Sequence, residues 1–485
     1  MNRHAFQLSR ISFLFLPLVL LGHGLAPRPI KNGLLLLASL FFYAWGETIY
    51  VFIMLGSIGA NYALGLCVGT AQGKVRRLWL GLAVVVNLGL LGGFKYANFL
   101  AGTLNEALLV PLGFAELHFD SVHLPIGISF FTFQALSYIF DVYRGNAVPQ
   151  RRIDRVALYI AMFPQLIAGP IVRYLDIADQ LIRRKVSRDA FAEGVTRFVI
   201  GLGKKLLIAN TLAVPADRVF SLDPGGIPAP LAWWGISCYA FQIYFDFSGY
   251  SDMAIGLGKM FGFRFPENFN YPYIATSMTD FWRRWHISLS TWFRDYVYIP
   301  LGGNRRGGVR TGLNLVIVFF LCGLWHGANW AFVVWGLWHG IFLVVERPFR
   351  RGNASAPDWG VRSLLRAVSA LCYIWGVVLL SWVVFRSDTL AGAMAYTGSL
   401  AGLAPVDDPP DVSLFVTHEQ LLVFLIAAAG CTPVAARFRA FANTRPAAAR
   451  VAGAVCRIMA LAVIFTLCSM KLAAGTYNPF IYFRF

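Results

Sequence analysis

The chain has 485 residues, of which 57% are hydrophobic and only 14% are charged. Soluble domains carry about 25% charged residues, so this composition excludes an ordinary soluble protein and indicates an integral membrane protein. The net charge of +18 fits short cytoplasmic loops facing anionic lipid better than nucleic-acid binding, because no motif of a nucleic-acid binder accompanies it.

Apolar runs without a formal charge recur along the whole chain. The first, at residues 11–26, lacks a clear signal-peptidase site and is better interpreted as a membrane span than as a secretory signal. Later runs include residues 33–46, 78–94, 231–245, 367–385 and 421–431. Many approach the ~20 residues that cross a bilayer, which predicts an all-α, multi-pass protein with roughly ten to twelve transmembrane helices. Hydrophilic insertions are short, so residues 1–485 are expected to form one integral membrane domain.

Two carboxylates follow the apolar run 231–245. Asp246 and Asp252 lie in "DFSGYSD", a segment rich in turn-forming residues. Carboxylates at a membrane boundary usually pair with a cation or line a pathway. The sequence leaves open whether these two cap a helix or contact a ligand.

A cluster of charged and aromatic residues occupies positions 276–303. It is too charged to face lipid and too aromatic for a solvated loop, which predicts an interfacial or re-entrant helix. Asp280 and Arg284 have the i,i+4 spacing of a helical ion pair, and structural pairing is the favoured interpretation for each charge. His286 is the member for which a functional role is slightly favoured. The ionisable residues of the cluster are Asp280, Arg283, Arg284, His286, Arg294 and Asp295.

Residues 312–345 contain no formal charge. As one helix this run of about 34 residues would measure roughly 51 Å, against a hydrocarbon core of about 30 Å, so we expect a break. The sequence "GLWHGAN" is the expected place, since Gly323, Gly327 and Asn329 weaken helical backbone. His326 would then lie in or near the wall of a cavity. The same letters "GLWHG" recur around His339, which we interpret as chance.

Several familiar catalytic arrangements are absent from the sequence. It has no G-x-S-x-G elbow, no H-E-x-x-H motif and no Walker A loop, and its eight histidines include no i,i+4 pair, so no metal site is predicted. The seven scattered cysteines form no CxxC pair and are predicted to be small core residues. A buried neutral imidazole can still take the proton from a hydroxyl that attacks an acyl carbon. From the residues alone, a catalytic role and a structural role are equally compatible with His326. A structural role is the favoured interpretation for His339 and His23.

Five long motifs occur in order along the chain. Together they resemble the membrane-bound O-acyltransferase (MBOAT) family, and the resemblance extends over nearly the whole sequence. The motifs are "PIGISFFTFQALSYIFDVYRG" (125–145), "FPQLIAGPIVRY" (163–174), "YFDFSGYSDMAIGLGKMFGFRFPENF" (244–269), "FWRRWHISLSTWFRDYVYIPLGGN" (281–304) and "GLWHGANWAFVVWGLWHG" (323–340).

The resemblance implies a multi-pass helical fold around a funnel or tunnel through the membrane. The family's catalytic histidine corresponds to His326, because the family pattern continues as "WHGANW" and not as the "WHGIFL" that follows His339. A second family histidine corresponds to His286, for which the resemblance suggests orienting the substrate or polarising the acyl group. No tightly bound cofactor is implied. The donor is expected to be acetyl-CoA or another acetyl thioester on the cytoplasmic side, and its binding residues are not assigned.

The family also implies a setting. We expect a protein of the bacterial cytoplasmic (inner) membrane that serves O-acetylation of an exopolysaccharide, alginate foremost. The expected partners are a periplasmic SGNH-type acetyltransferase, polysaccharide biosynthesis proteins and the lipid bilayer, with no nucleic acid. Cellulose, peptidoglycan or teichoic acid are alternative acceptors. A polysaccharide or acyl exporter is disfavoured because the two halves of the chain share no repeat, and a structural scaffold is equally disfavoured.

Overall fold

The computed structural model describes residues 14–118, 120, 123–349, 361–405 and 411–475, and over these residues it contains helices and no strands. The expected all-α architecture is therefore confirmed. The N-terminal helices are α2 (Leu16–Leu25), α3 (Lys31–Glu47), α4 (Val51–Thr70), α5 (Gly73–Leu91), α6 (Ala97–Leu104), α7 (Ile128–Arg144), α8 (Ile153–Ala161), α9 (Phe163–Leu166), α10 (Tyr174–Ile182) and α11 (Arg188–Gly203).

The later helices complete the body of the protein. They are α12 (Asn210–Phe220), α13 (Ala229–Met260), α14 (Met278–Arg284), α15 (Ile287–Phe293), α16 (Gly307–His326), α17 (Trp330–Glu346), α18 (Val361–Arg386), α19 (Leu390–Leu400), α20 (His418–Gly430), α21 (Val434–Asn443) and α22 (Ala447–Ala473). The π-helical segments that lie wholly within the described residues are η4 (Gly92–Tyr96), η5 (Asn105–Leu109), η6 (Lys204–Ala209) and η8 (Arg294–Tyr298). Short 3₁₀ segments are η2 (Arg28–Ile30), η3 (Thr48–Tyr50), η7 (Pro272–Ile274), η9 (Arg347–Phe349) and η10 (Val412–Leu414).

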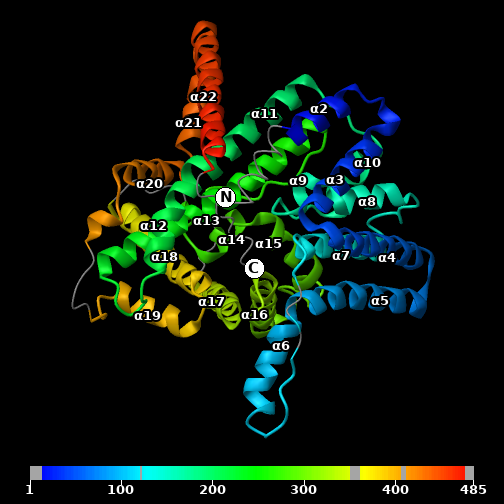
Figure 1. Cartoon of the computed structure of the whole chain (residues 1–485), viewed down its shortest axis with the longest axis horizontal. Coiled ribbons are helices and arrows are strands. Elements are labelled where there is room, and N and C mark those ends of the chain that lie inside the picture. The colour runs from blue at the N-terminus through cyan, green and yellow to red at the C-terminus, as the bar shows by residue number, and fades with distance from the viewer. Residues whose placement is uncertain (1–13, 119, 121–122, 350–360, 406–410, 476–485) are drawn as a thin grey trace.

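The longest helix, α13, runs through the middle of the molecule beside α11 (Figure 1). Glycines allow the two backbones to touch. A Cβ atom on Gly201 would lie 2.6 Å from the carbonyl oxygen of Gly249, and a Cβ on Gly256 would lie 2.6 Å from that of Gly194. Close approach through small residues is a common way for helices to pack in membranes, because in lipid no hydrophobic effect drives apolar side chains together.

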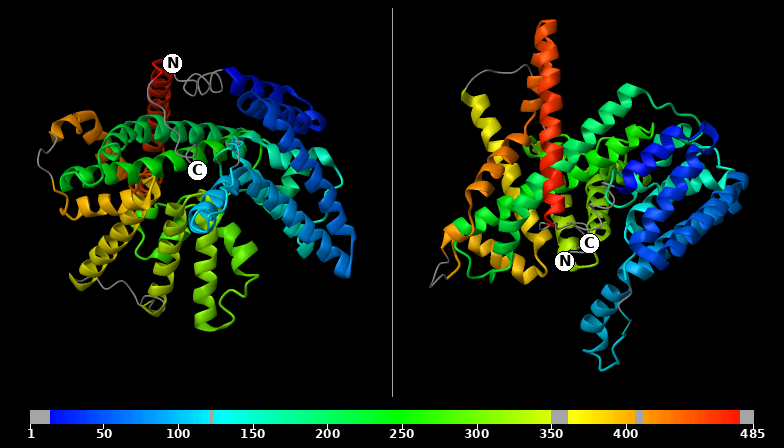
Figure 2. Two further views of the ribbon diagram at one scale, coloured as in Figure 1. Left: turned by 60° about the horizontal axis from the view of Figure 1, so that its bottom comes forward. Right: turned by 45° about the horizontal axis from the view of Figure 1, so that its top comes forward.

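The charged and aromatic segment 276–303 lies at the centre of the molecule. Its two short helices, α14 and α15, are surrounded by the longer helices (Figure 1). The rings of Phe281, Trp282, Trp285 and Trp292 are all buried there. Helices α16, α17 and α18, coloured from yellow-green to yellow, lie side by side next to this centre (Figure 2). The segment thus enters the protein, in agreement with the re-entrant form of the prediction.

Seven continuous helical stretches among the described residues are long and apolar enough to cross a membrane, or eight if the bent pair His418–Gly430 and Val434–Ala442 counts as one span. The number is smaller than the roughly ten to twelve expected from the run lengths. One reason is that α3 and α4 lie within a single stretch, Arg28–Thr70. Another is that α7 has only 17 residues. The first apolar run forms the ten-residue helix α2, while its residues 11–13 lie outside the described part of the chain.

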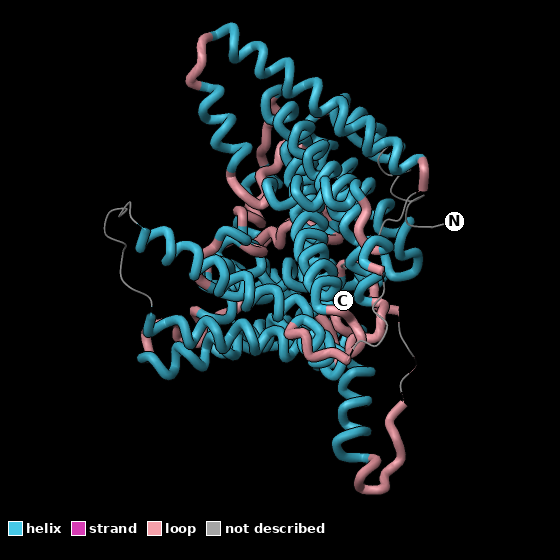
Figure 3. Tube along the Cα trace, turned by 90° about the vertical axis from the view of Figure 1, so that its left-hand side faces the viewer, coloured by secondary structure: helices cyan, strands magenta, loops and turns pink. Residues whose placement is uncertain are grey.

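Two segments project from opposite ends of the molecule. Helix α22 extends beyond the body at one end and α6 at the other (Figure 3). Only 6% of the most apolar part of α22 is buried inside the protein. Such a helix is apolar on nearly every face, as expected for a surface in contact with lipid.

Candidate active site

The expected break in the apolar run 312–345 is present. Helix α16 ends at His326, Gly327 is extended, and α17 begins at Trp330. Asn329 caps α17, since its Oδ1 accepts a hydrogen bond of 2.8 Å from the N–H of Ala331. A side-chain oxygen at this position satisfies one of the free N–H groups that begin every helix. The run therefore forms two antiparallel helices with His326 at the turn.

Glycines also set the distance between these two helices. A Cβ on Gly336 would overlap the carbonyl oxygen of Phe319, and a Cβ on Gly323 would overlap that of Phe332. The backbones of α16 and α17 are thus in direct contact one turn before His326. This contact fixes the position of the last turn of α16.

Two side chains from the π-helical segment η4 bind the carbonyl groups at the end of α16. The ammonium of Lys95 donates to the carbonyl oxygens of Trp325 at 2.6 Å and His326 at 3.2 Å. The hydroxyl of Tyr96 donates to the carbonyl of Leu324 at 2.5 Å. The last carbonyls of a helix lack internal partners and carry partial negative charge, so a cation stabilises them.

The imidazole of His326 is surrounded by aromatic rings. Its centroid lies 5.0 Å from Trp325, 4.9 Å from Trp335 and 5.4 Å from Phe385, with each ring pair nearly perpendicular. The residue is 6% exposed. His326 is thus buried among aromatic rings at a helix end.

His286 is completely buried and has an unusual backbone. It precedes α15 with φ 44° and ψ 53°, in the left-handed region that non-glycine residues rarely adopt. Its Nδ1 lies 3.1 Å from Oδ1 of Asn268, and its ring contacts Phe247 edge-on at 4.6 Å. His286 lies outside the candidate spans, and burial lowers the pKa of its imidazole to about 3. Residues in such strained conformations cluster at functional sites.

Trp325 connects the two histidines. Its ring centroid is 6.0 Å from that of His286 and 5.0 Å from that of His326. The fold therefore brings together the two residues that the resemblance indicated, from segments separate in sequence. The indole Nε1 of Trp325 and Nε2 of His286 are both buried, and neither has a hydrogen-bond partner among the described residues.

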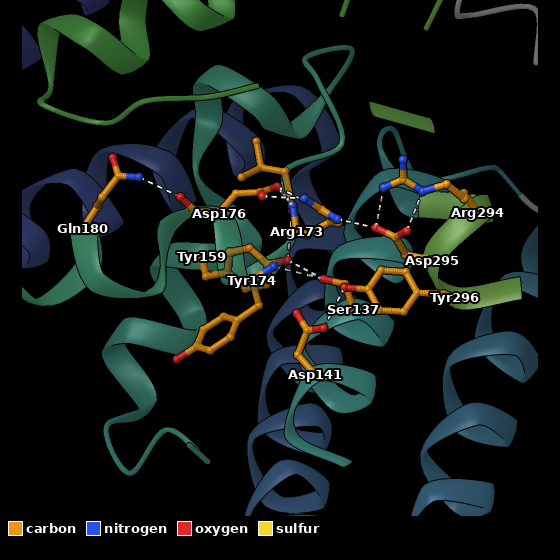
Figure 4. A network of polar contacts seen from close by, with 11 residues as sticks. Ser137, Asp141, Tyr159, Arg173, Tyr174, Asp176, Gln180, Arg294, Asp295 and Tyr296 are labelled. Carbon is orange, nitrogen blue, oxygen red and sulfur yellow. Dashed lines mark hydrogen bonds and ion pairs between the residues drawn. The ribbon is translucent and has the colours of Figure 1, made fainter. Parts of the chain in front are cut away.

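A polar network fixes the segment that follows His286. Arg173 donates to Asp295 at 2.5 Å and to Asp176 at 2.8 Å, and Arg294 donates to the same Asp295 at 2.7 Å (Figure 4). The next residue, Tyr296, donates its hydroxyl proton to Asp141 on α7 at 2.8 Å. Arg294 and Asp295 thus form structural ion pairs, as predicted for the charges of this cluster.

Other charged residues of the sequence prediction also pair. Asp280 and Arg284 form the expected ion pair, at 2.9 Å. Asp246 and Asp252 lie inside α13, away from its ends, and both form ion pairs. Asp246 pairs with buried Lys205 at 2.6 Å, and Asp252 binds Arg197 and Lys204 at 2.8 and 2.7 Å.

His339 and His23 lie in different surroundings. His339 is in α17, and the indole N–H of Trp282 donates to its Nδ1 over 3.4 Å. His23 is in α2 and packs edge-on against Phe261 at 5.1 Å. These contacts agree with the structural roles favoured from the sequence, which stay predictions.

Lys95, Tyr96 and Asn268 contact the two histidine segments but were not predicted from the sequence. Lys95 follows directly after the apolar run 78–94, and a charge in that position was the available signal. Asn268 lies in "FPENF", inside a motif that carried the resemblance, but nothing local assigns it to His286.

Over the described residues the fold is all-helical, and it packs the two imidazoles against one buried indole. The sequence matches the model of the MBOAT, membrane-bound O-acyltransferase family over residues 128–379, which include both histidines. The chain belongs to this family, and it is an O-acyltransferase. The expectation that residues 1–485 form one domain stays a prediction.

Several named relatives are similar to the chain over most of their length. The chain is 42% identical to the probable alginate O-acetylase AlgI of Pseudomonas putida, over 98% of both chains. It is 47% identical to the protein of the same name from Pseudomonas syringae pv. tomato, over 79% of this chain and 72% of the relative. It is 38% identical to the peptidoglycan O-acetyltransferase of Helicobacter pylori, over 81% of this chain and 78% of the relative.

Proposed function

We propose that this enzyme O-acetylates an exopolysaccharide, alginate foremost, from the bacterial cytoplasmic membrane. The proposal rests on one observation: the buried imidazoles of His326 and His286 both pack against the indole ring of Trp325. The similarity to proteins named alginate O-acetylase supports the choice of polymer. The similarity to a peptidoglycan O-acetyltransferase makes peptidoglycan the second candidate.

In the proposed reaction, the donor is acetyl-CoA or another acetyl thioester that enters from the cytoplasmic side. His326 takes the proton from the acceptor hydroxyl while its oxygen bonds to the acyl carbon. The carbon–sulfur bond then breaks, and the departing thiolate takes the proton from the imidazolium. His286 orients the substrate or polarises the acyl group.

The hydroxyl that receives the acetyl group belongs either to the polymer itself or to a partner protein. In the second case, a periplasmic SGNH-type acetyltransferase passes the acetyl group to the polysaccharide. Other polysaccharide biosynthesis proteins supply the polymer. Acetyl esters on a purified periplasmic partner would distinguish the two routes.

The test uses a deletion strain complemented with wild type, His326→Ala or His339→Ala, with membrane levels matched by immunoblot. The secreted polysaccharide is assayed for acetyl esters and its sugars are analysed. Esters are expected to disappear with His326→Ala and to persist with His339→Ala. Normal esters in the His326→Ala strain would remove His326 from the mechanism. Esters that depend on the enzyme but occur on the isolated cell wall, and not on the secreted polymer, would favour peptidoglycan over alginate.

A further inference from the structure

A chain of hydrogen bonds runs from the backbone to the ring of His286. The N–H of Ile171 donates to Oγ of Ser288 at 2.9 Å, and the Ser288 hydroxyl donates to Oδ1 of Asn268 at 2.9 Å. The same Oδ1 lies 3.1 Å from Nδ1 of His286. Asn268, Ser288 and His286 are all buried, with exposures of 1%, 4% and 0%.

The orientation of the Asn268 amide is fixed by its neighbours. The backbone N–H of Ser288 approaches the same atom at 3.2 Å, and because an N–H can only donate, that atom is the oxygen. The Nδ2 group then points to Ser251 and donates to its Oγ at 3.0 Å. A flipped amide would place two donors against each other at Ser288.

This orientation determines where His286 carries its proton. An amide oxygen only accepts, so Nδ1 of His286 is the donor in the 3.1 Å contact. A neutral imidazole has one N–H, and the burial that lowers the pKa of His286 to about 3 keeps the ring neutral. Its Nε2 therefore presents a lone pair, which has no hydrogen-bond partner among the described residues.

We infer that Asn268, supported by Ser288, is a positioning residue that keeps His286 in the Nδ1–H tautomer, so that Nε2 accepts a hydrogen bond from the acceptor hydroxyl. The inference rests on the proposed function and chooses between the two roles open for His286. A nitrogen with a lone pair can orient a hydroxyl, but it cannot donate to the carbonyl oxygen of the acyl group. His286 thus orients the acceptor and does not polarise the donor.

The acyl oxygen then needs a different donor. The indole N–H of Trp325 is suited to this, because it is buried without a partner among the described residues and its ring contacts both histidines. A donor that points at the developing oxyanion stabilises the transition state of acyl transfer.

The first experiment measures the tautomer directly. Purified wild-type protein labelled with ¹⁵N-histidine is studied by solid-state NMR in lipid, and the signals of residue 286 are identified by their loss in His286→Gln. The expected spectrum shows a protonated Nδ1 and an unprotonated Nε2. A protonated Nε2 in the neutral ring would overturn the inference, whatever the activity of the Asn268 variants.

The second experiment compares variants by the rate at which acetyl esters accumulate after induction. Asn268→Leu removes the accepting oxygen and is expected to reduce the rate at least roughly tenfold, the size of effect seen when a metal-bound histidine loses its hydrogen-bonding partner. Asn268→Asp keeps an accepting oxygen and should retain most of the activity. Asn61→Leu is the matched control, because Asn61 is also fully buried and hydrogen-bonded, to Ser57 and Asn87.

The outcomes separate the inference from the proposed function. Equal losses in Asn268→Leu and Asn268→Asp, or a normal rate in Asn268→Leu, would overturn the positioning role of Asn268 while leaving His326 in place. Normal esters in the uncomplemented deletion strain would overturn the proposed function, whereas normal esters in a parallel His326→Ala strain would remove only His326 from the mechanism. The tautomer is measured on the wild-type protein and does not depend on either strain.

Discussion

The segments that carry His326 and His286 are held in the protein in different ways. His326 ends a 20-residue helix whose last carbonyls bind Lys95 and Tyr96, so its position is set through the main chain. His286 lies in a left-handed turn, and its ring is bound through the side chain of Asn268. Main-chain anchoring fixes where a side chain begins, whereas side-chain hydrogen bonding also fixes which ring nitrogen carries the proton. In the proposed reaction, His326 transfers the proton and His286 orients the acceptor.

The largest effect that tests this comparison is expected from His286→Ala. Loss of a group that orients the reacting hydroxyl should reduce the rate of ester formation by roughly 10²-fold. The rate is measured in membranes with matched protein levels. His339→Ala removes another fully buried imidazole and is the control for packing. If both variants lose activity equally, the effect of His286 is one of packing alone.

A smaller effect is expected from Lys95→Met, which keeps the length of the side chain but removes the ammonium at the end of α16. The carbonyls of Trp325 and His326 lose their donor. A cation at a helix C-terminus contributes up to about 2 kcal/mol when partly buried, so a displaced His326 should slow transfer by roughly tenfold.

The control for charge and the rescue of Lys95 use two further variants. Lys74→Met removes an exposed lysine of α5 and should leave the rate unchanged. Lys95→Arg restores the cation and should recover part of the activity. A rate for Lys95→Met as high as that of Lys74→Met would show that the carbonyl contacts do not position His326.

The sequence predicted the parts of the site that depend on local chemistry. The break at "GLWHGAN" follows from the length of an uncharged run and from the glycines and the capping Asn329, and the Asp280–Arg284 pair follows from helical spacing. It did not predict that "DFSGYSD" lies inside a helix. The turn-forming tendency of this segment is outweighed by tertiary contacts, namely the Lys205–Asp246 ion pair and the contact of Gly249 with α11.

Contacts between distant segments could not be predicted in the same way. Lys95 binds carbonyls of residues 325 and 326, and Asn268 reaches His286 only because a strained turn points the ring toward it. No periodicity in helices that are apolar on all sides reveals which residues meet. The family resemblance selected both histidines, but it left the neighbours that determine their chemistry unassigned.

The smallest effect is expected from Gly336→Ala, which tests whether helix contact positions the His326 turn. The added methyl would overlap the carbonyl oxygen of Phe319 and push α16 and α17 apart. Overpacking of this kind costs about 1–3 kcal/mol, which should lower the melting temperature of the purified protein in detergent. Gly376→Ala in α18 is the control, since a Cβ there meets nothing within 4 Å.

The activity of the folded Gly336→Ala protein then distinguishes the two anchoring modes. Lys95 and Tyr96 still bind the end of α16 in this variant. The displacement of the His326 turn should therefore be smaller than the displacement of α16 from α17. The rate per folded molecule should fall only a few-fold. A loss as large as that of Lys95→Met would mean that the helix contact, and not the carbonyl contacts, determines the position of His326. An unchanged melting temperature would mean that α16 and α17 tolerate a wider spacing than the glycines impose.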